Sequence, residues 1–187
     1  MTYASTDYLE QLKLYHKQKE YTWGTGPPIA SKFPRILNLF DSYECNTILD
    51  YGCGSGSLKK YMRQEGHKMP IIEYDIGIAG KDSPPPKADL VVCMDVMEYV
   101  GDVLGHIAKL ADKVAYFEIC IWEAKAVLPD GRNAHVTVKP HEWWEKELGK
   151  HFYNVDYNFK PPAHLFYAGV SAISVLLNSL VSLQTTG

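Results

Sequence analysis

The sequence predicts an α/β fold, with an open and mostly parallel sheet that is covered by helices on both faces. Short apolar strands alternate with amphipathic helices from Thr47 onward, which is the order that a parallel sheet requires. The segment 89–94 is apolar almost throughout, as expected of a strand that is buried on both faces. Three glycines follow the first expected strand at alternating positions, which is typical of a turn that approaches a ligand closely.

Composition favours one globular domain. The 187 residues match the usual size of a single domain, with an N-terminal arm over 1–30 and a core over 31–187. Its 19 basic and 22 acidic side chains give a net charge of −3, which disfavours a nucleic-acid partner. Residues 1–19 lack an apolar signal core, and the four cysteines lack metal-ligand spacing, so we expect free thiols and a cytoplasmic location. The uncharged segment 161–187 is diluted by polar and small residues, which favours a final strand and an apolar tail over a membrane span.

The N-terminal half is expected to hold three helices and three strands. Ser5 and Thr6 can cap a short first helix, and a cluster of glycine and proline at 24–28 predicts a loop after it. Apolar residues at helical spacing predict a second helix over 31–40, with Pro34 in its first turn. The remaining expected elements are strands at 47–51, 71–75 and 89–94 and a helix at 58–64, which Gly66 stops.

The C-terminal half continues the same alternation. A stripe of five aliphatic residues predicts a long helix over 97–111, and an apolar run predicts a buried strand over 114–122. A turn at 129–131 precedes a helix over 141–150, whose Trp144 and Leu148 are expected to face the core. Strands at 153–159 and 165–173 end the sheet.

The turn after the first strand discriminates between ligands. A dinucleotide fingerprint would need Gly or Ala at position 57, where this chain has Ser57, and the Gly-Lys-Ser/Thr of a P-loop is absent. Asp50 stands two residues before the first glycine, where its carboxylate would repel a pyrophosphate but suit a primary ammonium group. S-adenosylmethionine carries such an ammonium group and has no phosphate.

Three segments carry a resemblance to a known family. Residues 50–56, Asp-Tyr-Gly-Cys-Gly-Ser-Gly, resemble the first motif of class I S-adenosylmethionine-dependent methyltransferases, and Asp75 matches the acid that binds the ribose hydroxyls there. Residues 89–100 resemble the strand-four motif of the small-molecule "type 11" branch, with Tyr99 where that branch usually has His. The resemblance implies a Rossmann-like class I methyltransferase fold with an antiparallel last strand and an N-terminal helical lid.

The same resemblance implies the cofactor and its contacts. The cofactor would be S-adenosylmethionine and its product S-adenosylhomocysteine, with no metal, since the histidines show neither i, i+4 pairing nor a carboxylate pattern. The implied cofactor-binding residues are Asp50, Gly52, Cys53, Gly54, Gly56, Asp75, Ile76, Asp82, Asp95 and Val96. The family places a helix and a strand between the second strand and Asp89. The thirteen residues available here include three prolines, so we expect that strand to be missing or vestigial.

Acceptor-side residues are expected in the loops after the central strands and in the N-terminal arm. His135 is the candidate general base, with a surface or capping histidine as the alternative, and Glu118 is expected to be paired or to lie near the ligand. The candidate substrate-binding residues are Tyr21, Trp23, Trp122, Arg132 and Lys139. The two charged residues among them could instead be solvated, and Trp23 could instead anchor the N-terminal arm.

These observations favour methyl transfer to a small molecule, with a nucleoside or sugar derivative among the candidates. Two alternatives stay open: a non-catalytic protein that binds S-adenosylmethionine, and an aminopropyl or aminocarboxypropyl transferase. The sequence is equally compatible with a monomer and a homo-oligomer.

Overall fold

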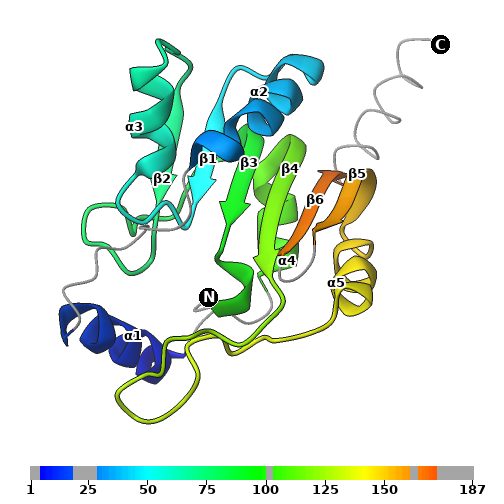
Figure 1. Ribbon diagram of the computed structural model, residues 1–187. Coiled ribbons are helices and arrows are strands. Elements are labelled where there is room, and N and C mark those ends of the chain that lie inside the picture. The colour runs from blue at the N-terminus through cyan, green and yellow to red at the C-terminus, as the bar shows by residue number, and fades with distance from the viewer. Residues whose placement is uncertain (1–4, 19–28, 100–102, 161–163, 172–187) are drawn as a thin grey trace.

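The centre of the molecule is a six-stranded sheet with strand order β2-β1-β3-β4-β6-β5 (Figure 1). The computed structural model describes residues 5–18, 29–99, 103–160 and 164–171. The strands are β1 (Ile48–Tyr51), β2 (Ile71–Tyr74), β3 (Ala88–Met94), β4 (Ala111–Cys120), β5 (Phe152–Lys160) and β6 (His164–Ser171). Strands β1 to β4 pair in parallel, whereas β6 runs antiparallel to both β4 and β5. The predicted α/β class, with a mostly parallel sheet and an antiparallel last strand, is therefore confirmed.

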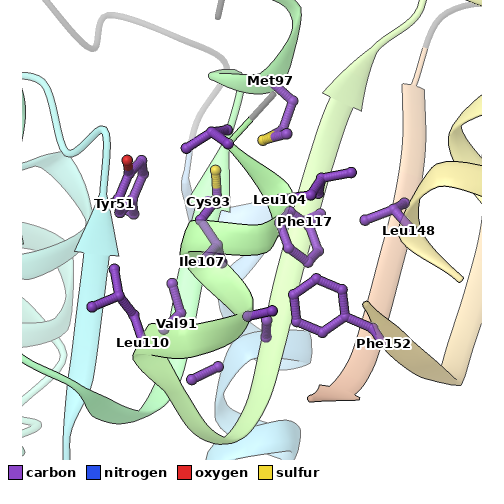
Figure 2. Close-up of a cluster of buried hydrophobic side chains, with 14 of the residues drawn as sticks. Tyr51, Val91, Cys93, Met97, Leu104, Ile107, Leu110, Phe117, Leu148 and Phe152 are labelled. Carbon is purple, nitrogen blue, oxygen red and sulfur yellow. The ribbon is translucent and has the colours of Figure 1, made fainter. Parts of the chain in front are cut away.

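Helices cover both faces of this sheet. The α-helices are α1 (Thr6–Gln18), α2 (Phe33–Ser42), α3 (Ser57–Gln64), α4 (Leu104–Leu110) and α5 (His141–Leu148), and the 3-10 helices are η1 (Ile29–Ser31) and η2 (Met97–Tyr99). Helices α2 and α3 bury their apolar stripes in one core cluster, and α4 and α5 bury theirs in a second cluster on the opposite face. The second cluster is drawn in Figure 2, where side chains from β1, β3 and β4 point toward α4.

The two cores follow from side-chain alternation along the strands. Ile48 belongs to the α2–α3 core and its neighbour Leu49 to the α4–α5 core; Leu90 and Val91 divide in the same way, and all four are fully buried. A strand that contributes apolar side chains to both faces has a continuous apolar sequence. Trp144 and Leu148 of α5 face the second core, as predicted.

The long helix predicted over 97–111 is wrong in its extent. The structure has the short η2 and then α4, and β4 begins at Ala111, three residues before the predicted strand start, and ends at Cys120. The carbonyl oxygen of Glu98 accepts hydrogen bonds from the backbone N–H groups of Val136 (2.8 Å) and Thr137 (3.0 Å). An α-helix would need that oxygen for the N–H four residues later, so this cross-loop pairing excludes a continuous helix.

The segment between β2 and β3 contains neither helix nor strand. Residues 75–87 form turns and bends, and β2 is the outer strand on that side of the described sheet. This agrees with the length argument from the three prolines.

Two sequence predictions fall partly or wholly outside this description. The apolar tail after β6 lies outside the described residues, as does the loop at 24–28. Within the described segments, no helix combines the length and the hydropathy that a membrane crossing needs.

Candidate functional site

The candidate site lies at the carboxyl ends of the parallel strands. The loops that follow β1, β2, β3 and β4 all leave the sheet at this edge, where open α/β sheets place their ligands. Helix α1 and the long loop between β4 and α5 also lie at this edge (Figure 1). They are packed together, because Tyr8 and Leu12 of α1 share a buried cluster with Leu128 and Ala134 of the loop.

The glycine turn after β1 needs its glycines for two separate reasons. Gly52, Gly54 and Gly56 have φ of 78°, 52° and 80°, in the left-handed region that side chains disfavour. A Cβ on Gly52 would lie 2.2 Å from the nearer methyl carbon of Val96, and one on Gly56 would lie 2.1 Å from Glu73 Oε1. The turn therefore packs too closely against its neighbours to admit a side chain at either position.

Asp75 fastens this turn to the end of β2. Its Oδ2 accepts a hydrogen bond from the Gly54 backbone N–H (2.9 Å), and its Oδ1 accepts one from the Gly77 N–H (2.8 Å). The side chain is buried, yet a carboxylate can accept about four hydrogen bonds, so these two leave capacity for a ligand.

Asp50 is buried near the carboxyl end of β1, next to the glycine turn. Burial, followed by the charge of Glu73, raises the pKa of this carboxyl to about 7, while the Lys81 ammonium group acts in the opposite direction. Asp50 and Glu73 are direct register partners on β1 and β2, so their side chains share one face. Near neutral pH, Asp50 is therefore close to half ionised and responsive to any added positive charge.

Two lysines neutralise Glu73, and the sequence analysis did not include this group. Lys59 Nζ lies 2.9 Å from one Glu73 oxygen and Lys81 Nζ 3.0 Å from the other, while Lys81 also donates to the Gly54 carbonyl oxygen (3.1 Å). Burial alone would raise the pKa of Glu73, but the two lysine hydrogen bonds outweigh it and lower the pKa. Strand alternation was the available signal, because Glu73 lies two residues before Asp75 and on the same face.

The remaining predicted cofactor residues divide by environment. Ile76 and Val96 are half-buried and pack on the α4–α5 core. Cys53 is buried, and desolvation raises the pKa of its thiol to about 12, so it is protonated and unreactive. Asp82 is exposed, and its Oδ1 accepts a hydrogen bond from the Gly80 N–H (3.1 Å) within its own turn.

A buried ion-pair triad joins the ends of β3 and β4 to the start of α2. Lys32 Nζ lies 2.8 Å from a carboxylate oxygen of Glu118 and 3.1 Å from one of Asp95, and Lys32 and Glu118 are buried. Burial would lower the pKa of Lys32, but the two carboxylates outweigh it and raise the pKa, so the ammonium group stays charged. Glu118 is thus paired, one of the two outcomes expected of it. The sequence analysis missed Lys32, which lies far from both acids in the chain.

His135 is held in a defined orientation in the loop after β4. Its Nδ1 lies 2.7 Å from the Trp122 carbonyl oxygen, its backbone N–H donates to Asn133 Oδ1 (2.9 Å), and its ring packs edge-on against Tyr99 at 4.7 Å between centroids. A carbonyl oxygen only accepts hydrogen bonds, so Nδ1 carries the hydrogen and Nε2 keeps its lone pair. At 9% exposure, His135 is not the surface histidine of the alternative reading.

The other acceptor-side candidates are not gathered around His135. Trp122 is 56% exposed, and Lys139 Nζ lies 5.9 Å from the centroid of the Trp143 ring. Arg132 pairs with Asp7 of α1 (2.6 Å) and with Asp130, which ties α1 to the loop. Tyr21 and Trp23 lie outside the described residues.

Comparisons with known proteins identify the family and the fold. A family model described as a methyltransferase domain matches residues 15–169. No curated protein matches the chain.

Solved structures match at low sequence identity. A putative S-adenosylmethionine-dependent methyltransferase from Listeria monocytogenes is 12% identical, with a TM-score of 0.54 over 76% of this chain and 98% of its own. The PH0226 protein from Pyrococcus horikoshii OT3 is 12% identical, with a TM-score of 0.53 over 85% of this chain and 98% of its own. Human N-acetylserotonin methyltransferase, solved in complex with S-adenosylmethionine, is 14% identical, with a TM-score of 0.54 over 88% of this chain and 56% of its own.

Proposed function

We propose that this chain, which belongs to the methyltransferase domain family, is a class I S-adenosylmethionine-dependent methyltransferase whose acceptor is a small molecule bound under the loop 121–139. The observation that carries the proposal is the pairing of Asp75 with the Gly54 N–H, which sets an acid with spare acceptor capacity beside a turn of left-handed glycines. Displacement at a sulfonium methyl carbon leaves a neutral thioether, so the transfer step itself depends on positioning and calls for no metal.

We assign the cofactor to the carboxyl ends of β1 and β2, which we call the β1–β2 end of the site. Asp75 would accept hydrogen bonds from both ribose hydroxyls, and Asp50 would face the ammonium group of the methionine part. Because burial raises the pKa of Asp50, a nearby cation stabilises its ionised form and is itself stabilised. The glycine turn allows close approach of the backbone, and Ile76 and Val96 supply apolar surface. We also assign Cys53, Asp82 and, from the neighbouring β3–β4 end, Asp95 to the border of the cofactor region.

The acceptor is assigned to the β3–β4 end, under the loop that carries His135. When bound, S-adenosylmethionine supplies an electrophilic methyl carbon on a positively charged sulfur, and transfer leaves neutral S-adenosylhomocysteine. In the ion-free protein, Nε2 of His135 accepts the proton that a hydroxyl or amine acceptor loses, since its lone pair is preserved by the Trp122 hydrogen bond. The loop and α1 exclude water and hold the acceptor in line with the carbon–sulfur bond.

Several features support a small acceptor. The net charge of −3 provides no general field for a nucleic acid, and Arg132, a candidate anion-binding group, is already paired with two carboxylates. A nucleoside or sugar derivative is our candidate acceptor, since Tyr99 offers an aromatic face beside the polar His135. The four cysteines are free thiols, which agrees with the proposed cytoplasmic location.

The test is an acceptor screen with methyl-labelled S-adenosylmethionine in small-molecule and nucleic-acid fractions of host extracts. We expect a labelled product in the small-molecule fraction, heavier than its precursor by one methyl group less one hydrogen, together with S-adenosylhomocysteine. Label in the nucleic-acid fraction would contradict the proposed acceptor class. Transfer of an aminopropyl or aminocarboxypropyl group, or cofactor binding without any product, would contradict methyl transfer.

A further inference from the structure

Three side chains of metal-ligand type converge beyond the cofactor region. Glu98 comes from η2 after β3, Cys120 ends β4, and His135 lies in the following loop. A carboxylate oxygen, the thiol sulfur and an imidazole nitrogen from these residues all lie within 4.8 Å of one another. Sequence spacing did not group them, because no two belong to the same element.

Glu98 is the observation that points to a ligand. Its side chain is only 1% exposed, and among the described residues no side chain donates a hydrogen bond to its carboxylate, which faces only the backbone N–H groups of Glu98 itself and Cys120. A buried carboxylate without a charged partner costs several kcal/mol, so such groups are neutralised, paired or bound to a cation. The nearby Lys32 ammonium group is already shared by Asp95 and Glu118.

The surroundings of His135 and Cys120 suit a ligand role. Donation from Nδ1 to the Trp122 carbonyl oxygen leaves Nε2 with a lone pair and fixes the ring, as the outer hydrogen bond of a metal-binding histidine does. The Cys120 thiol lies 3.8 Å from the same carbonyl oxygen. One backbone oxygen at the end of β4 therefore helps to position both side chains.

We propose that Glu98, Cys120 and His135 bind one divalent cation of the zinc type. Sulfur, nitrogen and oxygen donors together favour zinc or cobalt over magnesium or calcium, which prefer oxygen ligands alone. Binding replaces the thiol proton by the metal, and the thiolate and carboxylate then balance the two positive charges of the ion. Tetrahedral zinc ligands stand ~3.5 Å apart, so small side-chain rotations suffice to close the present cluster.

Three protein ligands leave one position of a tetrahedral ion open, as in catalytic rather than structural zinc sites. The transfer step itself needs no metal, so we assign the open position to an oxygen or nitrogen of the acceptor, a role that rests on the proposed function. Coordination would orient that atom and lower its pKa. In the ion-loaded protein, Nε2 of His135 is then a ligand, and the ion replaces it as the group that promotes proton loss.

The experiment is a Co²⁺ titration of chelator-treated full-length protein, followed by absorption spectroscopy. We expect one Co²⁺ per chain, d–d bands of tetrahedral intensity and a near-ultraviolet thiolate-to-cobalt band. The band should vanish in Cys120→Ser, and affinity should fall at least tenfold in Cys120→Ser and in Glu98→Gln. Cys45→Ser is the matched thiol control, because Cys45 is a free thiol like Cys120 but precedes β1 at the opposite edge of the sheet.

Further measurements distinguish a loss of ion binding from a loss of folding and from a loss of methyl transfer. Circular dichroism and Tm establish that each variant is folded, and a cluster variant that fails to fold is replaced by Cys120→Ala or Glu98→Ala. No stoichiometric Co²⁺ binding by the wild type, or a thiolate band that survives the loss of Cys120, would overturn the ion site. Binding through Cys120 in a protein that transfers no methyl group would leave the ion site standing and overturn the proposed function.

Discussion

The two ends of the candidate site differ in how completely their buried charges are satisfied. At the β1–β2 end, Asp75 accepts two backbone hydrogen bonds, and Glu73 is held by Lys59 and Lys81. At the β3–β4 end, the carboxylate of Glu98 is buried, and among the described residues no side chain donates a hydrogen bond to it. The first end is organised before any ligand arrives, whereas the second needs a proton or a cation to complete it.

The difference follows from how the chain builds each end. The β1–β2 end is held by contacts from the glycine turn to the next strand and its turn, over about thirty residues of sequence. The β3–β4 end is assembled from η2, β4 and the loop 121–139, and Asp95 there takes a left-handed φ of 52°. Contacts within one β-α-β unit therefore specify the cofactor end, whereas the acceptor end combines elements from a longer stretch of the chain, such as Lys32 with Glu118.

The largest effect should come from the acceptor end. His135→Ala and His135→Gln should lower turnover about 10²–10⁴-fold, because they remove the proposed proton acceptor or ion ligand. Affinity for S-adenosylhomocysteine, measured by calorimetry, should stay unchanged. His106→Gln on α4 is the matched control and should turn over normally. Normal turnover of both His135 variants on the true acceptor would show that His135 has only a structural role. The catalytic residue would then be sought in the N-terminal arm around Tyr21 and Trp23.

The next largest effect should come from Asp75. Asp75→Ala removes the proposed bonds to two ribose hydroxyls, worth ~1.5–3 kcal/mol, so cofactor affinity should fall by tenfold or more. It also frees the N–H groups of Gly54 and Gly77. Calorimetric titration with S-adenosylmethionine measures the loss. Asp112→Ala, at the start of β4 on the opposite edge of the sheet, serves as the exposed control. An affinity unchanged in Asp75→Ala would contradict the cofactor assignment.

A third prediction uses the pKa of about 7 that burial gives Asp50. The cofactor ammonium group favours the ionised carboxylate, so binding below this pKa must release the proton. Affinity should therefore fall as the pH drops below about 7, by up to about tenfold per unit. Asp50→Asn should flatten this dependence. Lys81→Met should move it to higher pH, because it removes the charge that lowers the pKa of Asp50. If cofactor affinity depended on pH in the same way in the wild type, Asp50→Asn and Lys81→Met, the proposed contact between Asp50 and the cofactor ammonium group would be contradicted.

The raised pKa of Asp50 also predicts how the free energy of unfolding of the ligand-free protein depends on pH. The unfolded chain releases the Asp50 proton near its ordinary pKa of 3.8, whereas the folded chain keeps it to about 7. Raising the pH across this window favours unfolding, so the stability contribution of the proton is present at low pH and is lost as the pH rises toward 7. Urea unfolding of the wild type and Asp50→Asn at several pH values should show the difference between them changing across that window.

The smallest effect should come from the surface of the acceptor loop. Arg132 is an exposed residue already paired with Asp7 and Asp130, so Arg132→Gln should change KM less than about twofold and lower Tm only slightly. Steady-state kinetics and a thermal melt measure the two effects. A large rise in KM would mean that Arg132 leaves its ion pairs to bind an anionic acceptor.

Sequence reasoning identified the elements that are set by local patterns. The glycine turn, the acid after β2 and the strand-free segment 75–87 are contiguous features with fixed spacing. The prediction of one helix over 97–111 was wrong because the spacing of aliphatic residues carries no information on long-range hydrogen bonds. In the structure, two backbone N–H groups of the loop donate to the Glu98 carbonyl oxygen. For the same reason, the sequence analysis assigned no role in the site to three residues whose partners or neighbours lie in other elements: Lys32, Cys120 and Glu98.

The central claim is that the β1–β2 end binds the cofactor and leaves the β3–β4 end for the acceptor. A crystal structure of the protein with S-adenosylhomocysteine tests it most directly. We predict the ribose hydroxyls within hydrogen-bond distance of Asp75, the amino group beside Asp50, and the sulfur directed toward the side of the edge that holds Glu98 and His135. Ribose hydroxyls placed away from Asp75, or a ligand that fills the Glu98–His135 end, would contradict the account.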